Sequence, residues 1–190
     1  MDNFKNFLRN TIGVPAKDIE YWTALCSVHK IKKNDYILKT GKIGNYAYFS
    51  ENGILRMYSI NSKGKECIIQ FGFEILFVFD HENFLNKPSK YYVQAIEDAE
   101  VVYIEKDIIN GIIKSYPQSA ERYAFLLNKE IARMQERINF FISATAEERY
   151  RNFLETCSDY IQRIPLYMVA SYLGITPECL SRLRGELARG

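Results

Sequence analysis

Residues 164–183, IPLYMVASYLGITPECLSRL, carry the signals for two short helices separated by a tight turn. Pro165 suits the first turn of a helix, where its missing N–H costs nothing. Gly174 stands where the end of a helix needs a residue in the left-handed conformation. Thr176 is a good N-cap for a second helix, and Pro177 is a good first residue of that helix. The stretch therefore predicts a helix, a short turn and a helix.

Two helices around a glycine turn form the helix-turn-helix pattern, whose second helix enters the major groove of DNA. Leu180, Leu183 and Leu187 recur at helical spacing and would face the protein interior. The remaining positions are the candidate DNA-binding residues: Thr176, Pro177, Glu178, Ser181, Arg182 and Arg184. The same pattern occurs in ordinary helical hairpins of protein cores, so the stretch alone leaves DNA binding open.

Each candidate residue has a chemical role at a DNA surface. An arginine such as Arg182 pairs with guanine through two hydrogen bonds, and Glu178 can accept one from a cytosine amino group. Ser181 would lie beside them and also read bases. Thr176 and Arg184 would hold phosphates, which position a protein on DNA without specifying sequence.

The composition indicates a globular chain with a real core. The 190 residues are 47% hydrophobic and 14% aromatic, with a formal net charge of +2. No apolar run approaches the roughly 18 residues of a membrane helix. The first residues lack the basic and then apolar layout of a signal peptide. We therefore expect a cytoplasmic protein without a membrane partner.

The sequence predicts neither a metal site nor an enzyme. The four cysteines are widely spaced, none is in a CxxC pair, and none lies near a histidine in sequence spacing typical of metal sites. These residues are Cys26, Cys67, Cys157, Cys179, His29 and His81. The chain has no P-loop and no nucleophile–histidine–acid motif. We expect no bound cofactor, although an unidentified small effector stays open.

The first half of the chain contains short β-type runs that alternate with turn signals. The runs cover residues 28–32, 36–39, 46–50, 54–60, 66–71, 75–79, 91–96 and 101–104. Short strands at near-regular spacing predict an antiparallel barrel or jelly roll. Asn52-Gly53 and Lys63-Gly64 both fit hairpin turns.

A long helix is predicted after Pro117, with apolar residues at alternating steps of four and three. These residues are Ala120, Ala124, Leu127, Ile131, Met134, Ile138 and Phe141. An unbroken seam over three heptads is typical of a coiled coil, so we expect a homodimer. The alternative is a long helix lying on its own core, which usually shows a wider apolar stripe. Thr145 and Glu148 form a capping-box pattern that begins the next helix, so residues 143–145 are the predicted hinge.

The chain therefore divides into three parts in an α+β fold. Residues 1–116 form an antiparallel β roll with flanking helices, and residues 117–143 form a dimerisation helix. Residues 144–190 form an all-α helix-turn-helix domain.

This order resembles the superfamily of cyclic-AMP receptor protein and the fumarate–nitrate regulator, the Crp/Fnr superfamily. The roll is similar to the cyclic-nucleotide-binding fold of that superfamily in residues 33–41, 48–56, 63–66 and 95–101. Residues 170–182, ASYLGITPECLSR, resemble the recognition motif of Bacteroidetes-type members. The resemblance implies a transcription regulator with double-stranded DNA, a second copy of the chain and RNA polymerase as partners. Pro177 stands where better-known members carry an arginine, so the operator is expected to differ from theirs.

The sensor half departs from that superfamily. Cyclic-nucleotide binders in it carry a Gly-Glu-Leu-Ala-like phosphate cassette, followed by an arginine and then Ser or Thr. Here Ser89 takes the place of the arginine and Lys90 that of Ser or Thr, and no Gly-Glu pair precedes them. A lysine interacts with an anion as a single point charge, whereas an arginine can donate two parallel hydrogen bonds. Cyclic AMP is therefore not expected, while Ser89, Lys90 and Tyr91 are candidate positions for another small effector.

We conclude from the sequence that the chain is a homodimeric, sequence-specific DNA-binding transcription regulator of the Crp/Fnr type. The alternative is a small-molecule-binding sensor or regulatory protein whose DNA-binding module is degenerate. Salt-dependent DNA binding separates the two, because a pure sensor lacks it.

Overall fold

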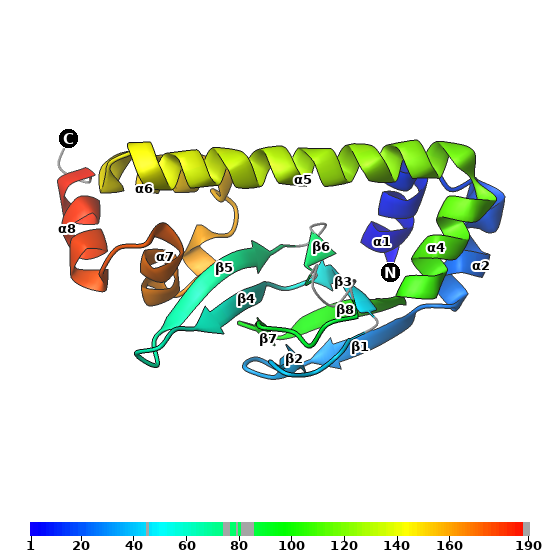
Figure 1. Ribbon diagram of the computed structural model, residues 1–190, viewed down its shortest axis with the longest axis horizontal. Coiled ribbons are helices and arrows are strands. Elements are labelled where there is room, and N and C mark those ends of the chain that lie inside the picture. The colour runs from blue at the N-terminus through cyan, green and yellow to red at the C-terminus, as the bar shows by residue number, and fades with distance from the viewer. Residues whose placement is uncertain (45, 74–76, 79, 81–85, 188–190) are drawn as a thin grey trace.

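One long helix spans the molecule, with the β strands along one side and the short C-terminal helices at one end (Figure 1). The computed structural model describes residues 1–44, 46–73, 77–78, 80 and 86–187. Strands occupy the first half of the chain and helices the second, with further helices at the N-terminus. The predicted α+β architecture is confirmed.

The N-terminal helices gather at the end of the molecule opposite the C-terminal helices (Figure 1). They are α1 (Asp2–Asn6), the π-helical turn η1 (Phe7–Ile12), η2 (Ala16–Asp18) and α2 (Ile19–Ala24). Together with α4 (Lys106–Ser115) they bury an apolar cluster that includes Phe4, Trp22 and Phe49. This cluster attaches the helices to strand β3 (Tyr46–Asn52).

The strands form two antiparallel sheets. One sheet has the order β1-β8-β3-β6 and the other the order β2-β7-β4-β5. Their bounds are β1 Ser27–Ile31, β2 Tyr36–Leu38, β4 Leu55–Ile60, β5 Glu66–Gly72, β6 Phe77–Val78, β7 Tyr92–Ala95 and β8 Ala99–Glu105. Each predicted run contains a strand. Of the predicted run 75–79, residues 75, 76 and 79 lie outside the described residues, as does His81.

The prediction of a hairpin at Asn52-Gly53 is wrong. Strand β3 pairs with β6 and β8, whereas β4 pairs with β5 and β7, so this turn carries the chain from one sheet to the other. Gly53 has φ +81°, and an added Cβ would lie 2.7 Å from the Cβ of Ala99. The Asn-Gly pair specified a left-handed residue, but it did not specify which sheet the next strand joins.

The second predicted turn is a hairpin. Residues 61–65 connect β4 to β5, and Gly64 has φ +75°. The Oδ1 atom of Asn61 accepts hydrogen bonds from the backbone N–H of Lys63 at 3.0 Å and of Lys65 at 3.1 Å. The side chain of Asn61 therefore stabilises the turn by accepting two hydrogen bonds from its backbone.

The second half of the chain is helical. Helix α5 (Pro117–Ser143) begins with Pro117 in its first turn, and α6 (Ala146–Thr156) begins with the predicted capping box. The Thr145 hydroxyl accepts from the N–H of Glu148 at 3.2 Å, and the Glu148 carboxylate accepts from the N–H of Thr145 at 2.7 Å. The remaining elements are η3 (Ile161–Arg163), α7 (Leu166–Leu173) and α8 (Pro177–Leu187).

The C-terminal helices pack on one face of the roll. Tyr150, Phe153, Val169 and Leu180 are buried in one cluster with Phe71 and other residues of the roll. The module thus shares its core with strands β4 and β5. This packing fixes where α8 lies relative to the sheets.

Candidate nucleic-acid interface

The turn between α7 and α8 has the geometry that the sequence predicts. Gly174 ends α7 in the left-handed conformation with φ +69°. The Thr176 hydroxyl accepts from the N–H of Cys179 at 3.2 Å and so caps α8. Pro165 lies one residue outside α7 with ψ 134°, so it precedes the helix instead of beginning it. Leu180 and Leu183 are buried, which turns the opposite face of α8 to solvent.

Helix α8 presents one continuous exposed face. Pro177, Glu178, Ser181, Arg182 and Gly185 line a shallow open depression on it. Positions 178, 181, 182 and 185 follow the spacing of one helical face. Gly185 was missed by the sequence reasoning, although its spacing from Glu178 marks it as part of the same face.

All six predicted DNA-binding residues have exposed side chains: Thr176, Pro177, Glu178, Ser181, Arg182 and Arg184. Arg184 does not line the depression, because its position points about a third of a turn away from Glu178. Arg182 therefore lies on the same outward face as Glu178, whereas Arg184 lies to one side of that face.

The charge of Glu178 is held at the N-terminus of α8. Hydrogen bonds from its own backbone N–H and from Thr176 lower the pKa of the Glu178 carboxyl, and Lys65 in the β4–β5 turn lowers it further. Glu178 is therefore ionised at neutral pH, and its carboxylate is an acceptor only.

The predicted dimer seam is largely exposed. The side chain of Ile131 is 53% exposed and that of Ile138 is 59% exposed, and Ala124, Met134 and Phe141 are exposed as well. Ala120 and Leu127 are half-buried near the N-terminal end of α5. Two neighbours outside the seam, Phe125 and Ile142, are also exposed. An apolar stripe of this length on the surface of one helix is typical of an interface.

The three candidate effector positions differ in their surroundings. Ser89 is only 2% exposed, and its hydroxyl donates to the carboxylate of Asp80, which is also 2% exposed. The same hydroxyl accepts from the N–H of Tyr91 at 3.0 Å. Tyr91 is half-buried, whereas Lys90 is exposed. Sequence reasoning missed Asp80, because nothing in the pattern marks which carboxylate of the loop turns inward.

The backbone of Ser89 is fixed as firmly as its side chain. Its carbonyl oxygen accepts from the N–H of Gly41 at 2.8 Å, and its N–H donates to the carbonyl of Lys42 at 2.9 Å. Ser89 therefore joins the loop at 40–42 to the residues before β7.

No metal-binding cluster occurs among the described residues: nowhere do three His, Cys, Asp or Glu side chains converge. No helix within the same residues is long and apolar enough to cross a bilayer.

Known proteins resemble this chain in sequence and in fold. The model of the cyclic nucleotide-binding domain matches residues 28–116. The anaerobic regulatory protein of Haemophilus influenzae is 30% identical in an alignment 171 residues long, and the alignment covers 84% of this chain and 66% of that protein. The fumarate and nitrate reduction regulatory protein of Vibrio cholerae is 28% identical over 177 residues, again 84% of this chain. The chain resembles members of the Crp/Fnr superfamily over most of its length.

The chain spans just under two thirds of the length of the Haemophilus relative. Both relatives are regulatory proteins by name. Among solved structures, FixK2 from Bradyrhizobium japonicum matches 86% of the chain and 85% of its own length with a TM-score of 0.75 and 18% identity. A CRP/FNR-family transcriptional regulator from Thermus thermophilus matches 86% of each chain with a TM-score of 0.67 and 20% identity. These structures share the Crp/Fnr fold of roll, long helix and helix-turn-helix.

Proposed function

We propose that this chain is a homodimeric, sequence-specific DNA-binding transcription regulator of the Crp/Fnr type. The observation that carries the proposal is the exposed face of α8, where Glu178, Ser181 and Arg182 lie together beyond a capped N-terminus. Residues at the N-terminal end of a recognition helix are those that reach base edges in the major groove.

The chemistry of this face fits base reading. The guanidinium of Arg182 is exposed and offers a fork of donors that matches the two acceptors of guanine. Glu178 is an ionised acceptor, which suits a cytosine amino group. The Ser181 hydroxyl can both donate and accept. Arg184 lies beside the face, where a phosphate of the groove wall would meet it.

The seam on α5 supports a dimer. Pairing two copies along this helix would cover the exposed side chains of Ile131 and Ile138. Each copy would then present one α8, and two recognition helices read half-sites about 34–36 Å apart. A near-palindromic operator is therefore expected. RNA polymerase is the partner expected of a transcription regulator in this superfamily. A protein that binds bacterial DNA would be located in the cytoplasm.

The roll is proposed to serve as a sensor or a remnant of one that does not bind cyclic AMP. Support comes from the buried pair of Ser89 and Asp80 at the place where cyclic-nucleotide binders carry an arginine. A cyclic phosphate at this place would meet a carboxylate and no guanidinium, and two like charges at short range repel.

Substitution of Arg182 tests the DNA-reading role. The protein is used to select its preferred duplex from a random DNA pool, and the affinity for that duplex is then measured. We expect Arg182→Ala to weaken binding to the selected duplex by about 1–3 kcal/mol and to relax the preference at one guanine. An Arg182→Ala protein with unchanged affinity and sequence preference would refute the reading-helix assignment.

Arg184→Ala is the matched control on the same helix. It should weaken binding to all duplexes alike. It should also reduce the slope of the logarithm of the binding constant against the logarithm of the salt concentration by about 1, which corresponds to the loss of one phosphate contact. If the unaltered protein shows no salt-dependent DNA binding at all, the alternative of a sensor with a degenerate DNA module is favoured.

A further inference from the structure

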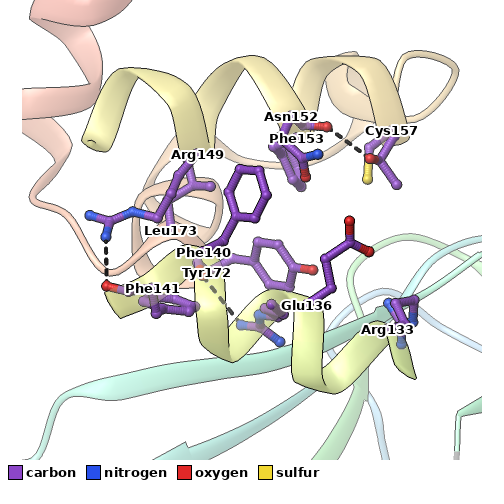
Figure 2. Close-up of a pocket in the computed structure, with 12 residues that line it drawn as sticks. Arg133, Glu136, Phe140, Phe141, Arg149, Asn152, Phe153, Cys157, Tyr172 and Leu173 are labelled. Carbon is purple, nitrogen blue, oxygen red and sulfur yellow. Dashed lines mark hydrogen bonds between the residues drawn. The ribbon is translucent and has the colours of Figure 1, made fainter. Parts of the chain in front are cut away.

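A cavity of about 150 Å³ lies between the second half of α5, the helix α6 and the helix α7 (Figure 2). Three arginines and an aromatic wall line it. These residues include Arg133, Arg137, Arg149, Phe140, Phe153 and Tyr172. The DNA-reading face of α8 contributes no residue to this cavity, and the predicted dimer seam contributes Phe141.

Arg137 is held in the cavity wall by neutral acceptors only. Its guanidinium donates to the backbone carbonyl of Ile69 in β5 and to that of Tyr172 in α7, the latter at 3.3 Å. It also lies 4.0 Å from the centre of the Tyr172 ring. Burial lowers the pKa of the Arg137 guanidinium, and the positive charge of Arg133 lowers it further. Within the described residues no carboxylate pairs with it.

Arg149 on α6 also meets only neutral acceptors, at a more exposed place beside the same Phe141 ring. Its guanidinium donates to the carbonyls of Phe141 at 3.3 Å and Ala144 at 3.5 Å. Its Nε atom is buried and has no hydrogen-bond partner among the described residues. Arg133 differs from both, because Glu130 accepts from its guanidinium at 2.8 Å.

Two guanidinium charges are thus left without a counter-ion at one cavity. Glu136 also lines the cavity, but no ion pair joins it to Arg137 or Arg149 in the described part of the chain. A partly buried charge without a partner is costly, and a bound anion would remove that cost.

The volume and lining of the cavity indicate the chemistry of the part of the ligand that is not the anionic group. An apolar cavity of about 150 Å³ holds one benzene ring. Aromatic walls pack well against another aromatic ring, and arginine binds a carboxylate through two parallel hydrogen bonds. We propose that this cavity is a binding site for a small aromatic carboxylate. Its ring would pack against Phe140, Phe153 and Tyr172, and its carboxylate would meet Arg137 and Arg149.

A ligand at this place would contact the elements on both sides of the predicted hinge at residues 143–145. It would tie α5 to α6 and α7, and so would bias where the helix-turn-helix lies. On α5 the centre of the cavity face lies about a third of a turn from the centre of the seam, and Phe141 belongs to both. The proposal does not depend on DNA binding, which is measured separately.

Benzoate is the probe that tests the site. Calorimetric titration of the folded protein should show saturable benzoate binding, and benzoate should raise the melting temperature. Neutral benzamide, which has the same ring and no charge, should bind at least about tenfold more weakly than benzoate. Inorganic phosphate, which has charge and no ring, should also bind more weakly.

The variants separate this site from a general effect of charge. Arg149→Gln should abolish benzoate binding. Arg151→Gln, on the same helix, makes the same change in charge at an exposed residue paired with Glu147 at 2.8 Å, and should bind benzoate like the unaltered protein. Should Arg149→Gln fail to fold, Arg149→Lys keeps the charge, loses the fork and should bind about tenfold more weakly.

Three outcomes would overturn the proposal. They are no saturable benzoate binding by the folded protein, equal binding of benzoate and benzamide, and full binding by the folded Arg149 variant. Preference for phosphate over benzoate would overturn the aromatic part of the assignment.

Discussion

The buried and partly buried arginines Arg56, Arg137 and Arg149 fall into two kinds. Arg56 is buried in the roll, and its charge is compensated there: it donates to the Glu66 carboxylate at 2.5 Å and to Gln94 at 2.9 Å. It also lies over the ring of Tyr58 at 4.2 Å. Arg137 and Arg149 meet only carbonyl oxygens and rings. The first kind stabilises a fold without needing a ligand, whereas the second kind favours a bound anion.

The buried pair of Asp80 and Ser89 leads to a prediction about the roll. Titration with cyclic AMP at millimolar concentration should give no saturable heat, because the phosphate would face the Asp80 carboxylate without an arginine. Isothermal calorimetry on protein shown to be folded by circular dichroism checks this. Saturable binding of cyclic AMP would contradict the proposal that the roll lacks this ligand.

Helix α5 combines three environments along and around its length. Tyr123 and Leu126 pack on the N-terminal cluster, and Arg137 reaches the β5 strand and α7. The seam faces solvent on another side, with Ile131 and Ile138 exposed. Such a helix packs against its own chain on one face and exposes another face that a partner could cover.

A charge placed in the seam should break the dimer. Ile138→Glu would put a carboxylate at an apolar position of a coiled coil, where both copies would bury it. We expect the protein to change from dimer to monomer in light scattering coupled to size-exclusion chromatography. Asn139→Glu adds the same side chain at the next exposed position, outside the seam, and should remain dimeric. A dimeric Ile138→Glu protein would show that the interface lies elsewhere.

At the scale of the molecule, the helix-turn-helix is joined to the roll through the free edge of β5. The Ser171 hydroxyl of α7 accepts from the N–H of Ile68 at 3.1 Å and donates to the carbonyl of Glu66 at 2.9 Å. The rings of Phe71, Phe153 and Tyr172 pack beside this contact. One side chain thus covers an edge that would otherwise present unpaired backbone groups.

Removal of this contact should loosen the module from the roll. Ser171→Ala would leave the Ile68 N–H and the Glu66 carbonyl without partners, which costs about 1–3 kcal/mol. Hydrogen exchange should therefore speed up at the Ile68 amide while strands β3 and β8 keep their protection. Ser158→Ala, the same substitution at an exposed residue of the module, should change neither. Unchanged exchange at Ile68 in Ser171→Ala would mean that the apolar contacts alone hold the module.

Local and periodic features could be predicted from the sequence. The left-handed conformation at Gly174, the cap at Thr176 and the capping box of Thr145 and Glu148 are all confirmed. Such features depend on residues within one or two turns, so the tertiary structure has little chance to override them. The eight strand positions followed from alternation with turn residues, and the resemblance to the superfamily rested on the order of the elements together with local motifs.

Tertiary structure alone decided the long-range features. It joined Asn52-Gly53 to a strand of the other sheet, turned Asp80 inward onto Ser89, and brought Arg137 and Arg149 to one cavity although they lie on different helices. The physical reason is the range of the interaction. A helix cap is satisfied within its own element, whereas sheet partners and the compensation of a partly buried charge depend on which distant segments pack together.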